Sequence, residues 1–218
     1  MKKAVIFDMD GLMIDSERTT YNCYVEKLHE LGHDDFTEEL YTQCLGKKKP
    51  GICQVFIDHY GEDFPMVEVW DDCHVMLDDT LRKHVPKKKG LDELLKYLKD
   101  HNYKTIVATS SARSRVDEIL ANAQITEYFD DSICGDEVTH GKPNPEIFLT
   151  ACEKLGVSKE EAIVLEDSEA GVLAAHNGDI DCICIPDMKY PEPEFEKLPI
   201  HIYDSLLDVI DYLEDVSK

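Results

Sequence analysis

Residues 4–11 read AVIFDMDG, an apolar run followed at once by two aspartates. The run from Ala4 to Phe7 is rich in branched residues and has no polar interruption, which is typical of a strand covered on both faces. The sequence therefore predicts a buried sheet whose first strand leads directly into Asp8. Similar runs recur at 105–108 (TIVA), 162–165 (AIVL) and 182–185 (CICI), with a weaker one at 132–134 (SIC).

Helix-like spacing of apolar residues separates these runs. Leucine, isoleucine and valine repeat at intervals of three and four at 91–98, 116–120 and 206–213, as they do on the buried face of an amphipathic helix. Ser158 begins a capping-box pattern that predicts a short helix. Strands that alternate with helices predict an α/β fold with a parallel sheet and right-handed crossovers.

The segment from 15 to 85 is different, because it contains helix-like stretches and no convincing strand. A normal crossover uses one helix, whereas this segment is long enough for about four. We therefore expect an all-α cap domain at 15–85, inserted into an α/β core domain formed by 1–14 and 86–218. The hinges are expected near Asp15 and within 86–90. The Pro- and Glu-rich segment 186–199 is expected to be a surface loop.

The charge and the cysteines exclude several classes of protein. With 46 acidic and 23 basic side chains in 218 residues, the formal net charge is −23, which disfavours binding to nucleic acid or to an anionic membrane surface. No apolar run approaches the length of a membrane span. The eight cysteines form no Cys-x-x-Cys pair, and no secretory leader precedes them. We therefore expect a cytoplasmic protein with reduced cysteines.

Polar side chains follow the predicted core strands, at the points where the strands end. Ligands of open parallel sheets bind at the carboxyl ends of the strands, so these side chains are expected to meet along one edge. Each alone has an ordinary explanation, such as a solvated acid, a capping hydroxyl or a surface lysine. Their joint occurrence in this order favours a functional site. The residues are Asp8, Asp10, Thr109, Ser110, Lys142, Glu166 and Asp167.

These segments resemble the four ordered motifs of the haloacid-dehalogenase-like hydrolase superfamily. The wider stretches 5–12, 15–17, 141–148 and 165–168 are similar to its β-phosphoglucomutase-like phosphatase branch. The resemblance extends over nearly the whole chain. It implies a Rossmann-like core with an inserted helical cap, a Mg2+ cofactor, and phosphoryl transfer through an aspartyl-phosphate.

Phosphoryl transfer needs an in-line nucleophile, charge neutralisation and a proton donor for the leaving oxygen. Asp8 is the expected nucleophile. Asp10 is expected to protonate the leaving alkoxide and then to deprotonate the attacking water. Two residues apart, the two side chains would share a face if the strand continued through Asp10. A Mg2+ ion would offset the repulsion between Asp8 and phosphate. Its expected carboxylate ligands are Asp8 and Asp167, with Glu166 bound directly or through water. The resemblance implies that the Asp10 main-chain carbonyl is a further Mg2+ ligand.

The remaining candidate residues are expected to bind the substrate. Thr109 and Ser110 would hydrogen-bond phosphate oxygens, and Lys142 would offset charge on both the phosphate and Asp8. The loop 46–51 (GKKKPG) gathers three lysines in an acidic chain, either as a solvated basic loop or as a cap loop for the distal part of the substrate. Lys49 falls where β-phosphoglucomutases carry a cation that binds a second phosphate.

Particular residues also discriminate between functions within and beyond the family. Asp10 argues against the dehalogenase branch, which lacks the second acid, and a Schiff-base lysine is disfavoured within a triple-lysine run. Thr20 stands where the mutases carry a histidine, which favours hydrolysis over isomerisation. We expect a Mg2+-dependent phosphatase for a small phosphomonoester, such as a sugar phosphate, that is a monomer or weak homo-oligomer. A phosphosugar mutase and a catalytically inactive phosphate-binding regulator are the alternatives.

Overall fold

The computed structural model describes residues 1–216 and contains a six-stranded parallel sheet. The strand order is β3-β2-β1-β4-β5-β6, so the first strand of the chain lies inside the sheet with β2 and β4 on either side. All five predicted strands are confirmed, within a residue or two at their ends. The strands are β1 (Ala4–Phe7), β2 (Lys104–Ala108), β3 (Asp131–Ile133), β4 (Ala162–Glu166), β5 (Asp181–Cys184) and β6 (His201–Ile202).

Alternate side chains of each strand enter two separate hydrophobic clusters, one on each face of the sheet. In β1, Val5 and Phe7 belong to one cluster, while Ala4 and Ile6 belong to the other. All four are fully buried, which explains why the run shows no apolar–polar alternation. Burial of each large side chain contributes about 1.5–3 kcal/mol, so both faces of the sheet hold the fold together.

Helices cover both faces, as the alternating pattern predicted. The buried leucines of α5 and α9 share a cluster with Val5 and Phe7, whereas α7 and α8 pack with Ala4 and Ile6. The predicted helical stretches are confirmed, and the capping box at Ser158 opens a short 3-10 helix at Lys159–Glu161. The core helices are α5 (Leu91–Asp100), α6 (Arg113–Asn122), α7 (Glu146–Leu155), α8 (Glu169–Asn177) and α9 (Leu207–Val216).

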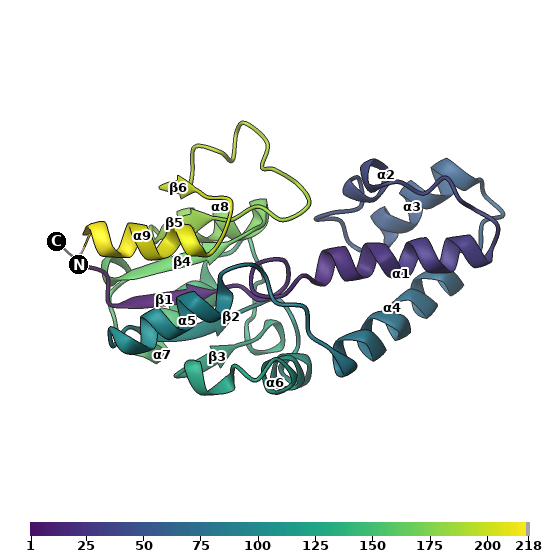
Figure 1. The fold of residues 1–218 in the computed structure, drawn as a ribbon. Coiled ribbons are helices and arrows are strands. Elements are labelled where there is room, and N and C mark those ends of the chain that lie inside the picture. The colour runs from purple at the N-terminus through teal and green to yellow at the C-terminus, as the bar shows by residue number, and fades with distance from the viewer. Residues whose placement is uncertain (217–218) are drawn as a thin grey trace.

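Four helices lie together beyond one end of the sheet, and we call residues 16–83 the helical cap (Figure 1). Its two longest helices, α1 and α4, run side by side. The chain enters and leaves the cap at neighbouring points, where the Asp15 amide donates to the Pro86 carbonyl at 2.8 Å. The helices are α1 (Ser16–Glu30), α2 (Glu38–Thr42), α3 (Lys49–Tyr60) and α4 (Met66–Lys83).

The carboxyl ends of the strands face the cap, while the N-terminus and the last described turn of α9 lie at the opposite end of the molecule (Figure 1). β1 ends at Phe7 and does not continue through Asp10, because the chain turns at Gly11, which has a positive φ of 84°. The segment 186–199 contains no helix or strand, as expected. The short edge strand β6 follows it and was not predicted.

Candidate active site

Lys142 stands at the centre of the strand-end residues. Its ammonium donates to Asp8 Oδ1 at 2.5 Å, to Glu166 Oε1 at 2.6 Å and to the Ala108 carbonyl at 3.1 Å. It also lies 4.8 Å from the centre of the Phe148 ring. Burial opposes its charge, but the two carboxylates more than offset this effect and raise the pKa of Lys142. The predicted meeting of Asp8, Lys142 and Glu166 at one sheet edge is thus present in the structure.

Asp8 and Asp167 occupy a site with more negative than positive charge. Burial raises the pKa of Asp8 to about 7 against the lowering effect of Lys142, and the charges of Glu166 and Asp10 raise it further. Burial also raises the pKa of Asp167 well above its usual range, with repulsion from Glu166 and Asp8 adding to the effect. An added cation would relieve the repulsion between these carboxylates.

Glu166 is fully buried and holds its neighbours by hydrogen bonds through both carboxylate oxygens. Oε1 accepts from Lys142, and Oε2 accepts from the Asp167 amide and from the amide and hydroxyl of Ser168, each at 3.0 Å. The helix α8 begins directly after these residues, and Gly171 in its first turn lets the Glu166 carboxylate approach its backbone. A Cβ placed on Gly171 would lie 1.7 Å from Oε1 of Glu166.

Gly171→Ala is therefore expected to destabilise the protein by about 1–3 kcal/mol, the usual cost of overpacking a core. Urea denaturation measures the change in the free energy of unfolding. Gly141→Ala is the matched control, because a Cβ there meets no atom within 4 Å, and its effect should stay within about 0.5 kcal/mol. Equal stability of the two variants would contradict the close approach of Glu166 to α8.

The residues after β2 reach the site through different side chains from those predicted. Thr109 is buried at the strand end, and its hydroxyl accepts from the Ser111 amide at 3.2 Å. Ser110 is exposed, and the structure records no contact of its side chain with the other site residues. Ser111 instead donates its hydroxyl to Asp10 Oδ2 at 2.7 Å, and Arg115 donates to Asp10 Oδ1 at 3.1 Å. Nothing in the sequence assigns a role to Ser111, which follows the predicted strand, or to Arg115, because serines and arginines near helix starts carry no distinguishing signal.

A cavity of about 200 Å³ lies between the site and the cap. Asp167 lines it from the core, while Glu17 and Gly46 line it from the cap. A second cavity of about 170 Å³ lies within the cap and shares Glu17 and Gly46 with the first. The Tyr41 hydroxyl donates to Glu17 at 2.6 Å, and burial raises the pKa of Glu17. Asp187 lines the first cavity, and its buried Oδ2 has no hydrogen-bond partner in the structure.

Lys49 lines neither of these cavities, although Trp70, which its ammonium contacts, lines the second. Its ammonium pairs with Asp71 at 3.0 Å and lies 5.3 Å from the centre of the Trp70 ring, with the side chain 44% exposed. Lys47 of the same loop lines the cavity within the cap. Lys47 and Lys49 therefore differ in their surroundings, although they belong to the same loop.

The fit of a divalent cation depends on the oxygen donors around Asp8. Within residues 1–216, no three His, Cys, Asp or Glu side chains gather closely enough to hold a metal ion by themselves. Asp167 packs against the turn after β1, where a Cβ on Gly11 would lie 2.3 Å from its Oδ2. Two mutually repelling carboxylates, Asp8 and Asp167, beside a main-chain turn form an oxygen donor set that suits Mg2+ completed by water.

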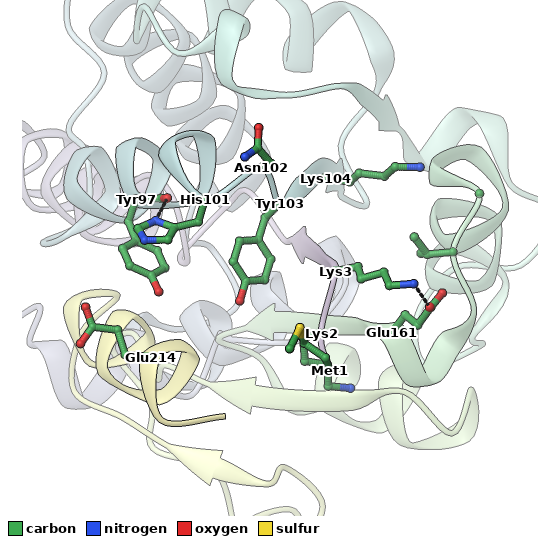
Figure 2. Close-up of a pocket in the computed structure, with 12 residues that line it drawn as sticks. Met1, Lys2, Lys3, Tyr97, His101, Asn102, Tyr103, Lys104, Glu161 and Glu214 are labelled. Carbon is green, nitrogen blue, oxygen red and sulfur yellow. Dashed lines mark hydrogen bonds and ion pairs between the residues drawn. The ribbon is translucent and has the colours of Figure 1, made fainter. Parts of the chain in front are cut away.

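A cavity of about 710 Å³ lies at the opposite end of the sheet (Figure 2). It is lined by residues next to the amino ends of the strands, including Lys3 and Lys104. Both lysines have partners already, since Lys3 pairs with Glu161 and Lys104 donates to the Leu155 carbonyl at 2.5 Å. This cavity holds none of the predicted site residues.

Comparison with known proteins identifies the family to which the chain belongs. The family model described as haloacid dehalogenase-like hydrolase matches residues 5–185. A phosphorylated carbohydrates phosphatase from Thermotoga maritima is 30% identical over 181 residues, 83% of each chain. A solved structure of a candidate β-phosphoglucomutase from Thermotoga maritima has a TM-score of 0.81 at 26% identity, covering 99% of this chain and all of the other.

CbbY from Rhodobacter sphaeroides, solved in complex with phosphate, has a TM-score of 0.70 at 26% identity, with 96% of each chain covered. The chain belongs to the haloacid dehalogenase-like hydrolase family. The predicted class, a phosphoric monoester hydrolase on a Rossmann-like fold, is confirmed at the level of the family. Across residues 1–216, no helix combines the length and the apolarity that crossing a bilayer requires.

Proposed function

We propose that this protein is a Mg2+-dependent phosphatase that hydrolyses a small phosphomonoester through an aspartyl-phosphate on Asp8. The observation that carries the proposal is the buried Lys142, which holds Asp8 at 2.5 Å at a strand end beside a cavity. Fixed positive charge next to a carboxylate orients it for attack and offsets the charge of an incoming phosphate. The same site residues belong to a chain whose relatives are phosphatases.

In the first step, Asp8 attacks phosphorus and the leaving alcohol departs on the opposite side. Lys142 offsets negative charge on Asp8 and on the transferred phosphoryl group, and the Thr109 hydroxyl orients a phosphate oxygen. Asp10 delivers its proton to the leaving oxygen. In the second step, Asp10 removes a proton from water, which attacks phosphorus and releases Asp8 with inorganic phosphate.

Asp8 and Asp167 would hold Mg2+ by carboxylate oxygens, and the Asp10 main-chain carbonyl would add a third oxygen. The bound ion would supply charge neutralisation between Asp8 and the phosphate. Glu166 has both oxygens engaged by Lys142 and by the start of α8, so we propose that it positions Lys142 and reaches the ion through water only. Around the site, four carboxylates outnumber two cationic side chains, Lys142 and Arg115. The carboxylates are those of Asp8, Asp10, Glu166 and Asp167.

The cavities support a hydroxylated rather than a doubly anionic substrate. Glu17 and Asp187 line the cavity next to Asp167, and its lysine, Lys189, already pairs with Glu169 at 3.1 Å. Carboxylates accept hydrogen bonds from hydroxyls but repel a second phosphate. The proposed cap domain at 15–85 would thus select the alcohol part of the ester, while the core would bind its phosphate. The Thermotoga maritima relative named a phosphorylated carbohydrates phosphatase is consistent with this substrate class.

A panel of phosphorylated metabolites assayed for phosphate release, with and without Mg2+, tests the proposal. We expect turnover of at least one sugar or polyol monophosphate in Mg2+, and a loss of at least about 100-fold after chelation by EDTA, because a metal supplies several kcal/mol of charge stabilisation. Restored activity on adding back Mg2+ is the control for damage by the chelator. Undiminished activity in EDTA would contradict the metal requirement, and binding of Mg2+ without turnover of any ester would favour an inactive regulator.

A phosphosugar mutase is the second candidate, favoured by the likeness to the candidate β-phosphoglucomutase. The first cap helix, α1, carries Thr20 at the position where the mutases carry a titratable histidine. The Thr20 hydroxyl donates to the Ser16 carbonyl of the same helix at 2.8 Å. A coupled assay with β-glucose 1-phosphate and a bisphosphate primer separates the two. Formation of glucose 6-phosphate supports the mutase, whereas release of free phosphate alone supports the phosphatase.

A further inference from the structure

Arg115, at the start of α6, contacts one acidic side chain of the core and one of the cap. Its Nη2 donates to Asp10 Oδ1 at 3.1 Å, and its Nη1 donates to Asp78 Oδ1 at 3.3 Å. Asp10 belongs to the turn after β1, whereas Asp78 lies on α4 of the helical cap. The planar guanidinium offers separate donors to two acceptors at once, so one side chain joins the cap to the turn that carries Asp10.

Asp10 is held on both carboxylate oxygens. The Ser111 hydroxyl binds Oδ2 at 2.7 Å, while Arg115 binds Oδ1. The side chains of Arg115 and Asp10 are 28% and 27% exposed, which is less than a solvated surface pair. Ser111 and Arg115 therefore restrict the rotation of the Asp10 side chain. Asp10 lies outside β1, which ends at Phe7, so the strand does not hold it.

We propose that Arg115 is a positioning residue, which fixes the orientation of the Asp10 carboxylate and makes this orientation depend on the contact between α4 and α6. The inference rests on the proposed function, because it takes Asp10 as the proton donor. Movement of the cap changes the distance between Asp78 and Arg115, and Arg115 transmits that change to Asp10. Proton donation is thereby linked to the cap position that shields the leaving group from water.

Dependence on the leaving group separates this role from a merely structural one. An alkoxide leaving group requires a proton from Asp10, whereas p-nitrophenolate leaves with little help. Arg115→Ala should therefore lower kcat/KM for glycerol 2-phosphate about tenfold, a part of the 10²–10⁴-fold that positioned acids contribute. For p-nitrophenyl phosphate the loss should stay below about threefold. Arg115→Lys should fall between, since one ammonium cannot replace both arms of the guanidinium.

Arg82 provides a matched control at the same contact between helices. It lies on α4 and pairs with Glu118 of α6 at 2.9 Å, so Arg82→Ala removes a cap–core ion pair without touching Asp10. We expect no difference between the two esters for this variant. Asp78→Asn should lower kcat/KM selectively for glycerol 2-phosphate, as Arg115→Ala does, but by only about two- to threefold. The loss is smaller because Asp10 still holds the guanidinium.

The outcomes distinguish the inference from the proposed function. If the wild-type protein hydrolyses both esters and Arg115→Ala lowers them equally, the positioning role is wrong and the phosphatase assignment stands. The same holds if Arg82→Ala reproduces the selective loss, because general weakening of the cap contact would then explain it. If the wild-type protein releases phosphate from no ester of the metabolite panel in Mg2+, the proposed function fails and takes this inference with it. A selective loss in Arg115→Ala alone supports the inference.

Discussion

Asp8→Asn is expected to lower turnover on the order of 10⁴-fold or more, because it replaces the proposed nucleophile by an amide that cannot form the aspartyl-phosphate. Steady-state phosphate release with the best ester of the panel measures the loss. Trapping the phosphoenzyme from labelled substrate adds a direct test, since wild-type protein should carry label and the variant should not. Near-normal turnover by the variant would assign the nucleophile to another residue.

The same substitution should leave the fold intact, which separates lost chemistry from lost structure. Lys142 keeps Glu166 as a charged partner at 2.6 Å, and the site loses one of its repelling carboxylates. The folded-state pKa of Asp8, about 7, lies above its ordinary value of 3.8. Ionised Asp8 therefore disfavours the folded state, and its contribution to stability falls as pH rises from about 4 to 7.

Without Mg2+, the variant should consequently match or exceed the wild-type melting temperature at pH 8, measured by thermal denaturation. A lower melting temperature would show that Asp8 supports the fold through its charge. Mg2+ should raise the melting temperature of the wild type more than that of the variant, because ligands that bind only the folded state stabilise it.

Lys142→Ala is expected to have the largest effect on stability, about 3–5 kcal/mol, because it leaves the buried Asp8 and Glu166 carboxylates without their shared cation. Activity should also fall by about 10²–10³-fold, the usual cost of removing a fixed electrostatic contact to the transition state. Urea denaturation gives the free energy of unfolding, and activity is measured where the variant remains folded.

Two further variants test the physical reason for that loss. Lys159→Ala removes a lysine whose partner Asp179 is 83% exposed, and its effect should stay within about 1 kcal/mol. Adding Glu166→Gln to Lys142→Ala removes one unpaired buried charge and should restore part of the stability. A double variant that is no more stable than Lys142→Ala would contradict the assignment of the cost to unpaired charge.

The predicted elements show where sequence periodicity suffices. The apolar runs form strands because a strand buried on both faces must be apolar at every position. The leucines of 91–98 form the buried face of α5, because a helix buried on one face is apolar at every third or fourth position. β6 escaped prediction because His201–Ile202 is a two-residue edge strand without an apolar run. β1 ends before Asp10, so the condition under which Asp8 and Asp10 would share a face of the strand is not met, because the chain turns at Gly11.

The candidate site likewise has one part that could be predicted from the sequence and one part that could not. Strand order and sheet topology bring Asp8, Lys142 and Glu166 to one edge, so their meeting could be inferred from positions along the chain. Ser111 in contact with Asp10, and Lys49 in contact with Asp71, could not be inferred. Such contacts depend on the rotation of loops and helices, which neighbouring residues in the sequence do not encode.

The sequence by itself determined the order of strands and helices, the family and the chemical types of the site residues. These follow from local patterns, which act over a few residues and leave a periodic record in the chain. Only the tertiary structure decided that Glu166 faces Lys142, and that Arg115 joins Asp10 to Asp78. Those partners lie 24, 105 and 37 residues apart, and their contacts arise from packing between whole elements, where small rotations decide which side chains meet.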